Sequence, residues 1–188
     1  MSGFYLRKAT LNDRPALEAL IADSARGLSH ADYTDAQVEA ALGGAFGVDS
    51  ELIRDETYFV AEVDGRIVGC GGWSRRATLY GSDAQAGRQS AVLDPERDAA
   101  RIRAFFVHPE WARRGIGRAI LERCEAEARA HGFRSAELLS TLPGHKFYRT
   151  LGYAGEEAVR HDLRDGVTID FIPMKKELKE SGGGTGGA

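Results

Sequence analysis

The sequence predicts a single α/β domain in which helices flank a mixed central sheet of about six to seven strands. Near the N-terminus, residues 4–8 alternate between apolar and polar types, as is typical of a half-buried strand. The clearest hairpin joins TYFVAEV to RIVGCGGW through Asp64-Gly65, a pair favoured in two-residue type I′ turns. One long segment, residues 113–130, repeats apolar residues at helical spacing, with Ile116, Ile120, Cys124 and Ala128 on one face.

The elements are expected in the order strand, two helices, three strands, helix, strand, short helix and two strands. Thr10 is the expected N-cap of the first helix. The second helix is expected to begin near Thr34 and to end at Gly43-Gly44. A long polar loop over residues 75–99 separates the hairpin from the next strand. The remaining expected elements are strands at 4–8, 101–107 and 135–140, a short helix through Phe147 and Tyr148, and a last strand pair around Asp165-Gly166.

Length and composition suit one domain. Of the 188 residues, 1–180 are expected to form the domain, and the glycine-rich stretch 181–188 is expected to be a flexible tail. A net charge of −3 argues against a nucleic-acid-binding face, which would be basic. No apolar run approaches the ~18 residues of a membrane helix, and the N-terminus lacks the apolar stretch of a signal peptide.

The cysteine and histidine pattern points to a reducing compartment and to no metal. Cys70 lies in a strand pattern and Cys124 in a helix pattern, so both are expected as isolated buried thiols of a cytoplasmic protein. No Cys or His pair has the spacing of metal ligands.

The most informative segment is FFVHPEWARRGIGRAI, in which a strand is followed by a glycine loop that opens the longest helix. The first turn of a helix has unpaired N–H groups and partial positive charge, and glycines let a ligand approach them. Arg113, Arg114 and Arg118 add fixed positive charge, so the segment predicts a pyrophosphate site. Because Gly117 is followed by Arg118-Ala119, the segment does not fit a P-loop. A dinucleotide fingerprint fits poorly, since position 120 is Ile.

This segment resembles motif A of the GCN5-related N-acetyltransferases (GNAT), Arg/Gln-x-x-Gly-x-Gly/Ala, whose loop holds the pyrophosphate of coenzyme A. The similarity covers roughly residues 3–175 and includes FYRTLGY at 147–153. Two positions depart from the family pattern: Ala112 stands at the Arg/Gln position, and Thr141 stands where an Asn is frequent. The resemblance implies acetyl-CoA as co-substrate, bound by Phe105, Phe106, Val107, Arg113, Arg114, Gly115, Ile116, Gly117, Arg118, Ala119 and Thr141.

The resemblance also assigns Tyr148 as the general acid that protonates the departing thiolate. A phenol with a reference pKa of about 10 can donate a proton without being ionised at neutral pH. No single residue stands out as the base that accepts the proton of the amine. Five candidates stay open, as does a low-pKa amine that needs none; the five are Glu62, Asp94, Glu137, His108 and His145.

Two arginines of the strand before the glycine loop suggest an acceptor site. Strand alternation places Arg101 and Arg103 on one side, where they could hold a carboxylate or phosphate of the substrate. Trp73, Tyr80 and the 75–99 loop could line the same cleft. The alternative is that both arginines pair with the local acids Asp94, Glu96 and Asp98.

The resulting hypothesis is an acetyl-CoA-dependent N-acetyltransferase that moves an acetyl group directly, in a ternary complex, to a small-molecule amine. The alternatives are a protein lysine or N-terminal acetyltransferase and a non-catalytic acyl-CoA sensor. The expected partners are the amine and, in a homodimer, a second copy of the chain, with no nucleic acid and no membrane.

Overall fold

The computed structural model describes residues 3–85, 88 and 91–179, which contain one seven-stranded sheet in the order β1-β2-β3-β4-β5-β7-β6. The tail expected at 181–188 lies outside the described residues. The strands are β1 (Tyr5–Lys8), β2 (Tyr58–Val63), β3 (Arg66–Ser74), β4 (Ala100–Val107), β5 (Ser135–Thr141), β6 (Val159–Asp162) and β7 (Thr168–Glu177). The helices are α1 (Arg14–Leu28), α2 (Asp35–Ala41), α3 (Ser50–Arg54), α4 (Ile116–Ala130) and α5 (His145–Thr150).

The sheet is mixed, as the sequence predicts. All neighbouring strands run antiparallel except β4 and β5, which are parallel. The hairpin between β2 and β3 turns at Asp64 (φ 47°) and Gly65 (φ 79°), both positive as a type I′ turn requires. The predicted α/β class and strand number are therefore confirmed.

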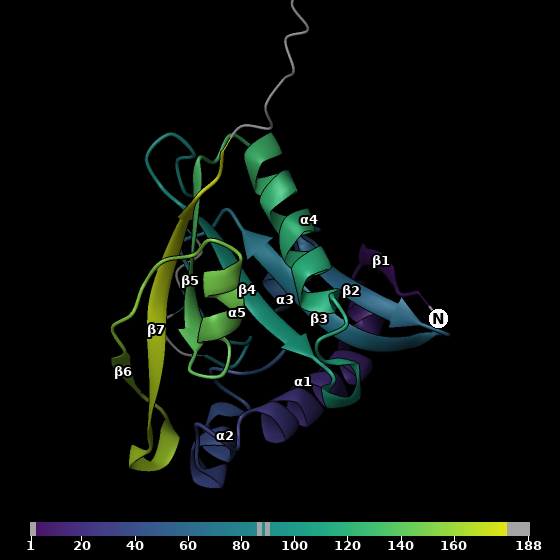
Figure 1. Cartoon of the computed structure of the whole chain (residues 1–188), viewed down its shortest axis with the longest axis vertical. Coiled ribbons are helices and arrows are strands. Elements are labelled where there is room, and N and C mark those ends of the chain that lie inside the picture. The colour runs from purple at the N-terminus through teal and green to yellow at the C-terminus, as the bar shows by residue number, and fades with distance from the viewer. Residues whose placement is uncertain (1–2, 86–87, 89–90, 180–188) are drawn as a thin grey trace, which may run out of the picture.

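Helices cover both faces of the sheet, and each face has its own core. Figure 1 shows α4 crossing one face, where the predicted stripe Ile116, Ile120, Cys124 and Ala128 is buried against β2, β3 and β4. The opposite core is formed by α1, α2 and α3, with Leu17, Ile21 and Leu52 fully buried. Burial of apolar surface on both faces is the main force that stabilises such a layered fold.

The two parallel strands separate soon after they meet. Only Ala100 with Ala136 and Arg101 with Glu137 are paired between β4 and β5, and the two strands diverge toward their C-terminal ends (Figure 1). The backbone groups of later β4 residues that face β5 therefore have no partner in that strand. This opening in the sheet joins its two faces.

A bulge in β4 places successive side chains on both faces of that opening. Arg103 pairs with Gly72 and Phe106 with Cys70, so Ala104 and Phe105 both lie opposite Gly71, and Ala104 has φ 56°. A Cβ on Gly71 would lie 2.7 Å from the Phe105 ring, so glycine is needed there.

The structure differs from the sequence-based expectation in two elements. The helix α3 was not predicted, because five residues are too short to show a 3.6-residue period. The helix predicted from residue 113 begins at Ile116, because Arg113 (φ 62°) and Gly115 (φ 82°) adopt left-handed conformations that a right-handed helix excludes. In the described ranges, no helix has both the length and the apolar character needed to cross a membrane.

Candidate active site

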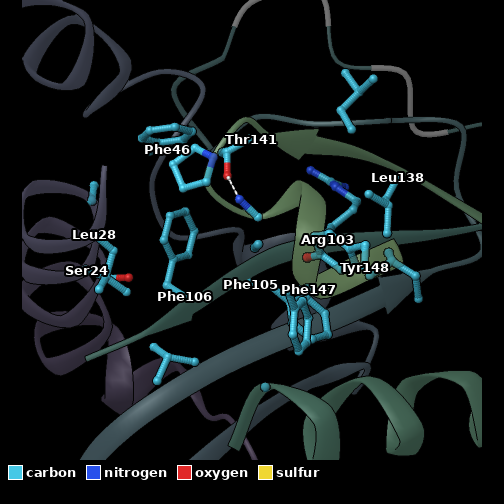
Figure 2. Close-up of a pocket in the computed structure, with 18 of the residues that line it drawn as sticks. Ser24, Leu28, Phe46, Arg103, Phe105, Phe106, Leu138, Thr141, Phe147 and Tyr148 are labelled. Atoms are coloured by element: carbon cyan, nitrogen blue, oxygen red, sulfur yellow. Dashed lines mark hydrogen bonds between the residues drawn. The ribbon is translucent and has the colours of Figure 1, made fainter. Parts of the chain in front are cut away.

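A cavity of about 760 Å³ occupies the opening between β4 and β5. Its volume falls in the range of about 300–1,000 Å³ that is usual for small-ligand sites. Figure 2 shows Ser24, Leu28, Phe46 and Phe106 on one side, and Phe105, Phe147 and Tyr148 on the other. Residues of both cores line the cavity. One part of the lining contains the start of α4, and the other contains mainly aromatic and aliphatic side chains.

We call these parts the glycine-loop half and the aromatic half. The glycine-loop half is lined by Phe105, Val107, Trp111, Arg113, Gly115, Ile116, Gly117, Arg118 and Phe147. The aromatic half is lined by Ser24, Leu28, Phe46, Tyr80, Ala104, Phe106, Leu139 and Phe171.

The glycine-loop half is built from backbone groups at the start of α4. Gly115 is the N-cap, and its positive φ of 82° is the backbone conformation that glycine tolerates best. The carbonyl of Gly115 accepts the first helical hydrogen bond, from the N–H of Ala119, so the N–H groups of the preceding turn have no helical partner. At Gly117 a Cβ would lie 3.1 Å from the Phe147 ring, so glycine keeps this turn open. Such a helix start binds anionic oxygens.

The arginines of the loop differ in position. Arg113 and Arg118 line the cavity, whereas the guanidinium of Arg114 lies 4.6 Å from the centre of the Trp111 ring and is absent from the lining. Ala119 also lies outside the lining, one turn into the helix. Arg118 lies 3.9 Å from Glu122 one turn later, a solvent-exposed pair that leaves its charge largely available.

The β4 residues named from the sequence all reach the cavity. Phe105, Phe106 and Val107 line it, and they belong to the part of β4 that has separated from β5. Thr141 lines the cavity from the end of β5, where its hydroxyl accepts a hydrogen bond of 3.2 Å from the N–H of Gly144. The sequence-predicted loop, strand and Thr141 positions thus meet at one site, with Arg114 and Ala119 beside it.

Tyr148 lies on α5, faces the cavity, and is only 8% exposed. Its ring packs edge-on against Phe105, Phe147 and Tyr153, with centroid distances of 6.3, 5.0 and 5.8 Å. Its hydroxyl forms no hydrogen bond within the described part of the chain. Burial, with a smaller contribution from Cys124, raises the pKa of Tyr148 well above its usual value near 10. The phenol therefore stays protonated and can donate to a group in the cavity.

The aromatic half is a wall of rings that pack against one another. Phe46 meets Phe106 edge-on at 5.7 Å, and Tyr80 meets Phe171 in the same manner at 5.7 Å. Phe46 also lies 6.2 Å from Phe171. The rings come from the segment after α2, the loop after β3, and the strands β4 and β7, so four distant parts of the chain form this wall.

The structure corrects the expected roles of Trp73 and Arg101. Trp73 is fully buried beneath the end of α4, against His131 and Phe133, and lies outside the cavity. Arg101 forms an ion pair with Glu137 on β5, at the point where the two strands still touch. Neither side chain lines the cavity, because the sequence pattern does not show which segment covers each of them.

Arg103 lines the cavity, but its guanidinium is already paired with a carboxylate of the protein. It forms an ion pair with Asp49, and the two side chains are 1% and 0% exposed. It also donates a 2.9 Å hydrogen bond to the carbonyl of Gly81, which holds the loop after β3 against the site. Asp49, the N-cap of α3, accepts a further hydrogen bond from Arg88. The alternative interpretation expected Arg103 to pair with Asp94, Glu96 or Asp98. Its partner is Asp49 instead.

The five candidate bases are all placed outside the cavity lining. Glu62 pairs with Arg7 on β1, and Glu137 pairs with Arg101. Asp94 accepts a hydrogen bond from the N–H of Glu96 in a turn of the long loop. The ring of His108 accepts one from the N–H of Glu110, and that of His145 contacts the carbonyl of Gly155.

The buried thiols are unsuited to chemistry in this cavity. Burial raises the pKa of Cys70 to about 12, and the Tyr58 hydroxyl donates a hydrogen bond to its sulfur. Cys124 is also buried, and its pKa is raised by the same cause. Within the described ranges, no cluster of three His, Cys, Asp or Glu residues could hold a metal ion.

Within the aromatic half, the sequence carried no functional signal for Phe46 or Phe171, whereas Phe106 and Tyr80 were named from it. Phe46, Tyr80 and Phe171 lie far apart in the sequence and have no motif of their own. Phe46 and Phe171 read as ordinary core residues, and Tyr80 lies in a loop. The local signal for this part of the cavity was the long 75–99 loop with Tyr80, which was expected to line the acceptor cleft.

Solved structures share this fold. A GCN5-related N-acetyltransferase from Rhodopseudomonas palustris superposes with a TM-score of 0.69, 21% identity, and coverage of 95% of this chain and 98% of that one. The PaiA N-acetyltransferase from Thermoplasma acidophilum, in complex with coenzyme A, gives 0.62 with 16% identity over 93% and 99%. N-acetylglutamate synthase from Neisseria gonorrhoeae, with coenzyme A and N-acetyl-glutamate, gives 0.60 with 17% identity over 96% and 36%.

At these identities the similarity shows the fold alone. No curated protein sequence matches the chain. The family is shown by a sequence model of the acetyltransferase (GNAT) family, which matches residues 19–153. This range includes the whole of β4, the glycine loop and Tyr148. The chain therefore belongs to the acetyltransferase (GNAT) family.

Proposed function

We propose that this acetyltransferase moves an acetyl group from acetyl-CoA directly to the amine of a small molecule, with both substrates bound together. The observation that carries the proposal is one continuous cavity, with a helix start suited to anions in one half and an aromatic wall in the other. Two substrates can then meet beside Tyr148 without an acetylated form of the protein. The similarity to structures that hold coenzyme A supports this choice of co-substrate.

The residues of the glycine-loop half fit a coenzyme A molecule. The free N–H groups at the start of α4 and the cations Arg113 and Arg118 suit a pyrophosphate. The backbone edge of residues 105–107 that has separated from β5 suits the amides of an extended pantetheine arm. Bound acetyl-CoA would supply an activated acetyl thioester.

In this proposal Tyr148 donates the proton that the leaving sulfur takes up. Its raised pKa keeps the phenol protonated, and its hydroxyl has no competing partner in the described residues. Overall, the amine nitrogen gains the acetyl group and loses one proton, while the coenzyme leaves as its free thiol. The Tyr148 proton is restored from the amine through water.

The number of separate segments that line the aromatic half favours a small molecule over a protein acceptor. Its wall combines α1, residues 45–47, residues 79–81, β4 and β7, which surround the acceptor end of the cavity. An extended peptide needs an open groove. The free Tyr148 hydroxyl favours an enzyme over a sensor, because a sensor has no use for a proton donor there.

Calorimetric titration with acetyl-CoA tests the coenzyme site. We expect micromolar binding that Arg113→Glu weakens about tenfold or more, because a carboxylate would replace a cation in the lining. Arg114→Glu is the matched control, since Arg114 lies outside the lining and should have the smaller effect. Absence of binding by the unaltered protein would overturn the proposal, and equal effects of the two variants would contradict the placement of Arg113.

A further inference from the structure

In the described part of the chain, the charged side chains that line the cavity all carry positive charge. The charged residues that line it, within the described residues, are Arg103, Arg113, Arg118 and Lys146, all cations. No Asp, Glu or His is among those lining residues. In the nearby loop, the residues outside the described set are Ala86, Gly87, Gln89 and Ser90, which carry no acidic group either. An ammonium ion entering the cavity would find no counter-charge.

Ring packing in the aromatic half covers part of the ring surface that could attract a cation in place of a carboxylate. A cation is attracted to the face of an aromatic ring. Here Phe46 and Phe106 meet at an interplanar angle of 74°, and Tyr80 and Phe171 meet at 60°. In each pair, the edge of one ring therefore covers one face of its neighbour. The Arg103 charge behind the wall is offset by Asp49, which is itself fully buried.

From these two observations, and resting on the proposed function, we propose that the acceptor is an amine on an apolar, aromatic body that binds as the neutral free amine. Burial in an apolar site disfavours the charged form and lowers the pKa of an ammonium group. The cavity therefore selects weakly basic amines and excludes diamines and lysine side chains. The ring wall contacts the aromatic body.

The same inference accounts for the lack of a base in the lining. An amine that loses its proton to water before binding needs no carboxylate or histidine to remove it beside the thioester. All five base candidates from the sequence lie outside the lining. The proton that leaves the acetylated nitrogen then passes to water, as in the overall balance given above.

An acceptor panel, read by release of free thiol from acetyl-CoA, tests the inference. The probes are phenethylamine, its less basic analogue 2,2-difluoro-2-phenylethylamine, 1,4-diaminobutane and a lysine peptide. We expect kcat/KM at neutral pH to be highest for the difluoro amine, and at least about 100-fold higher for phenethylamine than for the diamine. For phenethylamine, kcat/KM should rise about tenfold per pH unit as its neutral fraction grows, whereas the difluoro amine should show no such rise.

A charge introduced into the wall provides the structural test. Ser24 is buried on α1 and lines the aromatic half opposite Tyr148 (Figure 2). Ser24→Asp should shift the ratio of kcat/KM toward the diamine by about tenfold or more, because it supplies the missing counter-charge. Ser24→Asn, which has the same shape without the charge, should leave the ratio unchanged. Acetyl-CoA binding by both variants, measured by calorimetry, shows that they are folded.

The outcomes separate this inference from the proposed function. Preference for the diamine or the peptide, or acetyl-CoA binding without turnover of either aromatic amine, would overturn the neutral-amine inference alone. Failure of the unaltered protein to bind acetyl-CoA would overturn the proposed function, and the inference with it. A kcat/KM for phenethylamine that reaches a plateau near neutral pH would indicate a base in the protein and would also overturn the inference.

Discussion

The two halves of the cavity are built in different ways. The glycine-loop half uses backbone N–H groups and a few arginines within one continuous stretch, residues 105–118. The aromatic half uses side chains from segments as far apart as Phe46 and Phe171, and it has no motif. The difference teaches that a site built from local backbone geometry is visible in a sequence, whereas a site built from packed side chains is not.

The largest expected effect concerns the support of the aromatic half. Asp49→Asn would leave the buried Arg103 guanidinium without its counter-charge, and loss of one partner of a buried pair costs about 3–5 kcal/mol. We expect that loss in the free energy of unfolding, measured by denaturant titration. Glu39→Gln, in the exposed pair with Arg26, is the control and should have little effect. Equal results for the two variants would show that the buried pair does not support this wall.

The next effect concerns Tyr148, which is placed to serve both halves. Tyr148→Phe should lower kcat about 100-fold, because general acid catalysis contributes about that much or more, while the Kd for acetyl-CoA stays within about twofold. Tyr153→Phe is the matched control, since the Tyr153 hydroxyl donates to Glu125 and lies outside the cavity lining. A parallel loss of coenzyme affinity and kcat in Tyr148→Phe would make Tyr148 a binding residue.

A smaller effect is expected in the glycine-loop half. Gly117→Ala places a Cβ 3.1 Å from the Phe147 ring and beside the free N–H groups of the first turn. We expect acetyl-CoA affinity to fall about tenfold by calorimetry, with KM for the amine little changed. If the variant instead altered only the amine KM, the two halves would not bind separate substrates.

No effect is expected from Tyr148 ionisation over the ordinary pH range. Because burial raises the pKa of Tyr148, the protonated phenol persists above the pH where an exposed tyrosine would ionise. The kcat measured with a weakly basic amine should therefore show no decline up to about pH 10. A decline below that pH in the unaltered protein that disappears in Tyr148→Phe would contradict the placement of a buried phenol.

The fold was predictable because its signals are local and repeated. The type I′ pair Asp64-Gly65, the apolar stripe of α4 and the order of strands and helices each depend on neighbours within a few residues. The short α3 and the left-handed Arg113 gave no such signal, so one helix was missed and another was started three residues early.

The candidate site was predictable to a lesser extent. Strand alternation placed Arg101 and Arg103 on one side of β4, as expected, but could not show that Glu137 and Asp49 cover them. Trp73 read as a cleft residue because it ends a strand beside arginines, yet the end of α4 buries it.

The sequence by itself determined the layered α/β fold, the helix start that suits a pyrophosphate, and the tyrosine beside it. Glycine positions and residue periodicity act through backbone conformation, which adjacent residues decide. Only the tertiary structure decided the separation of β4 from β5, the ring wall of Phe46, Phe106, Tyr80 and Phe171, and the absence of a carboxylate from the described lining. These features depend on contacts between residues far apart in the chain, which no local pattern encodes.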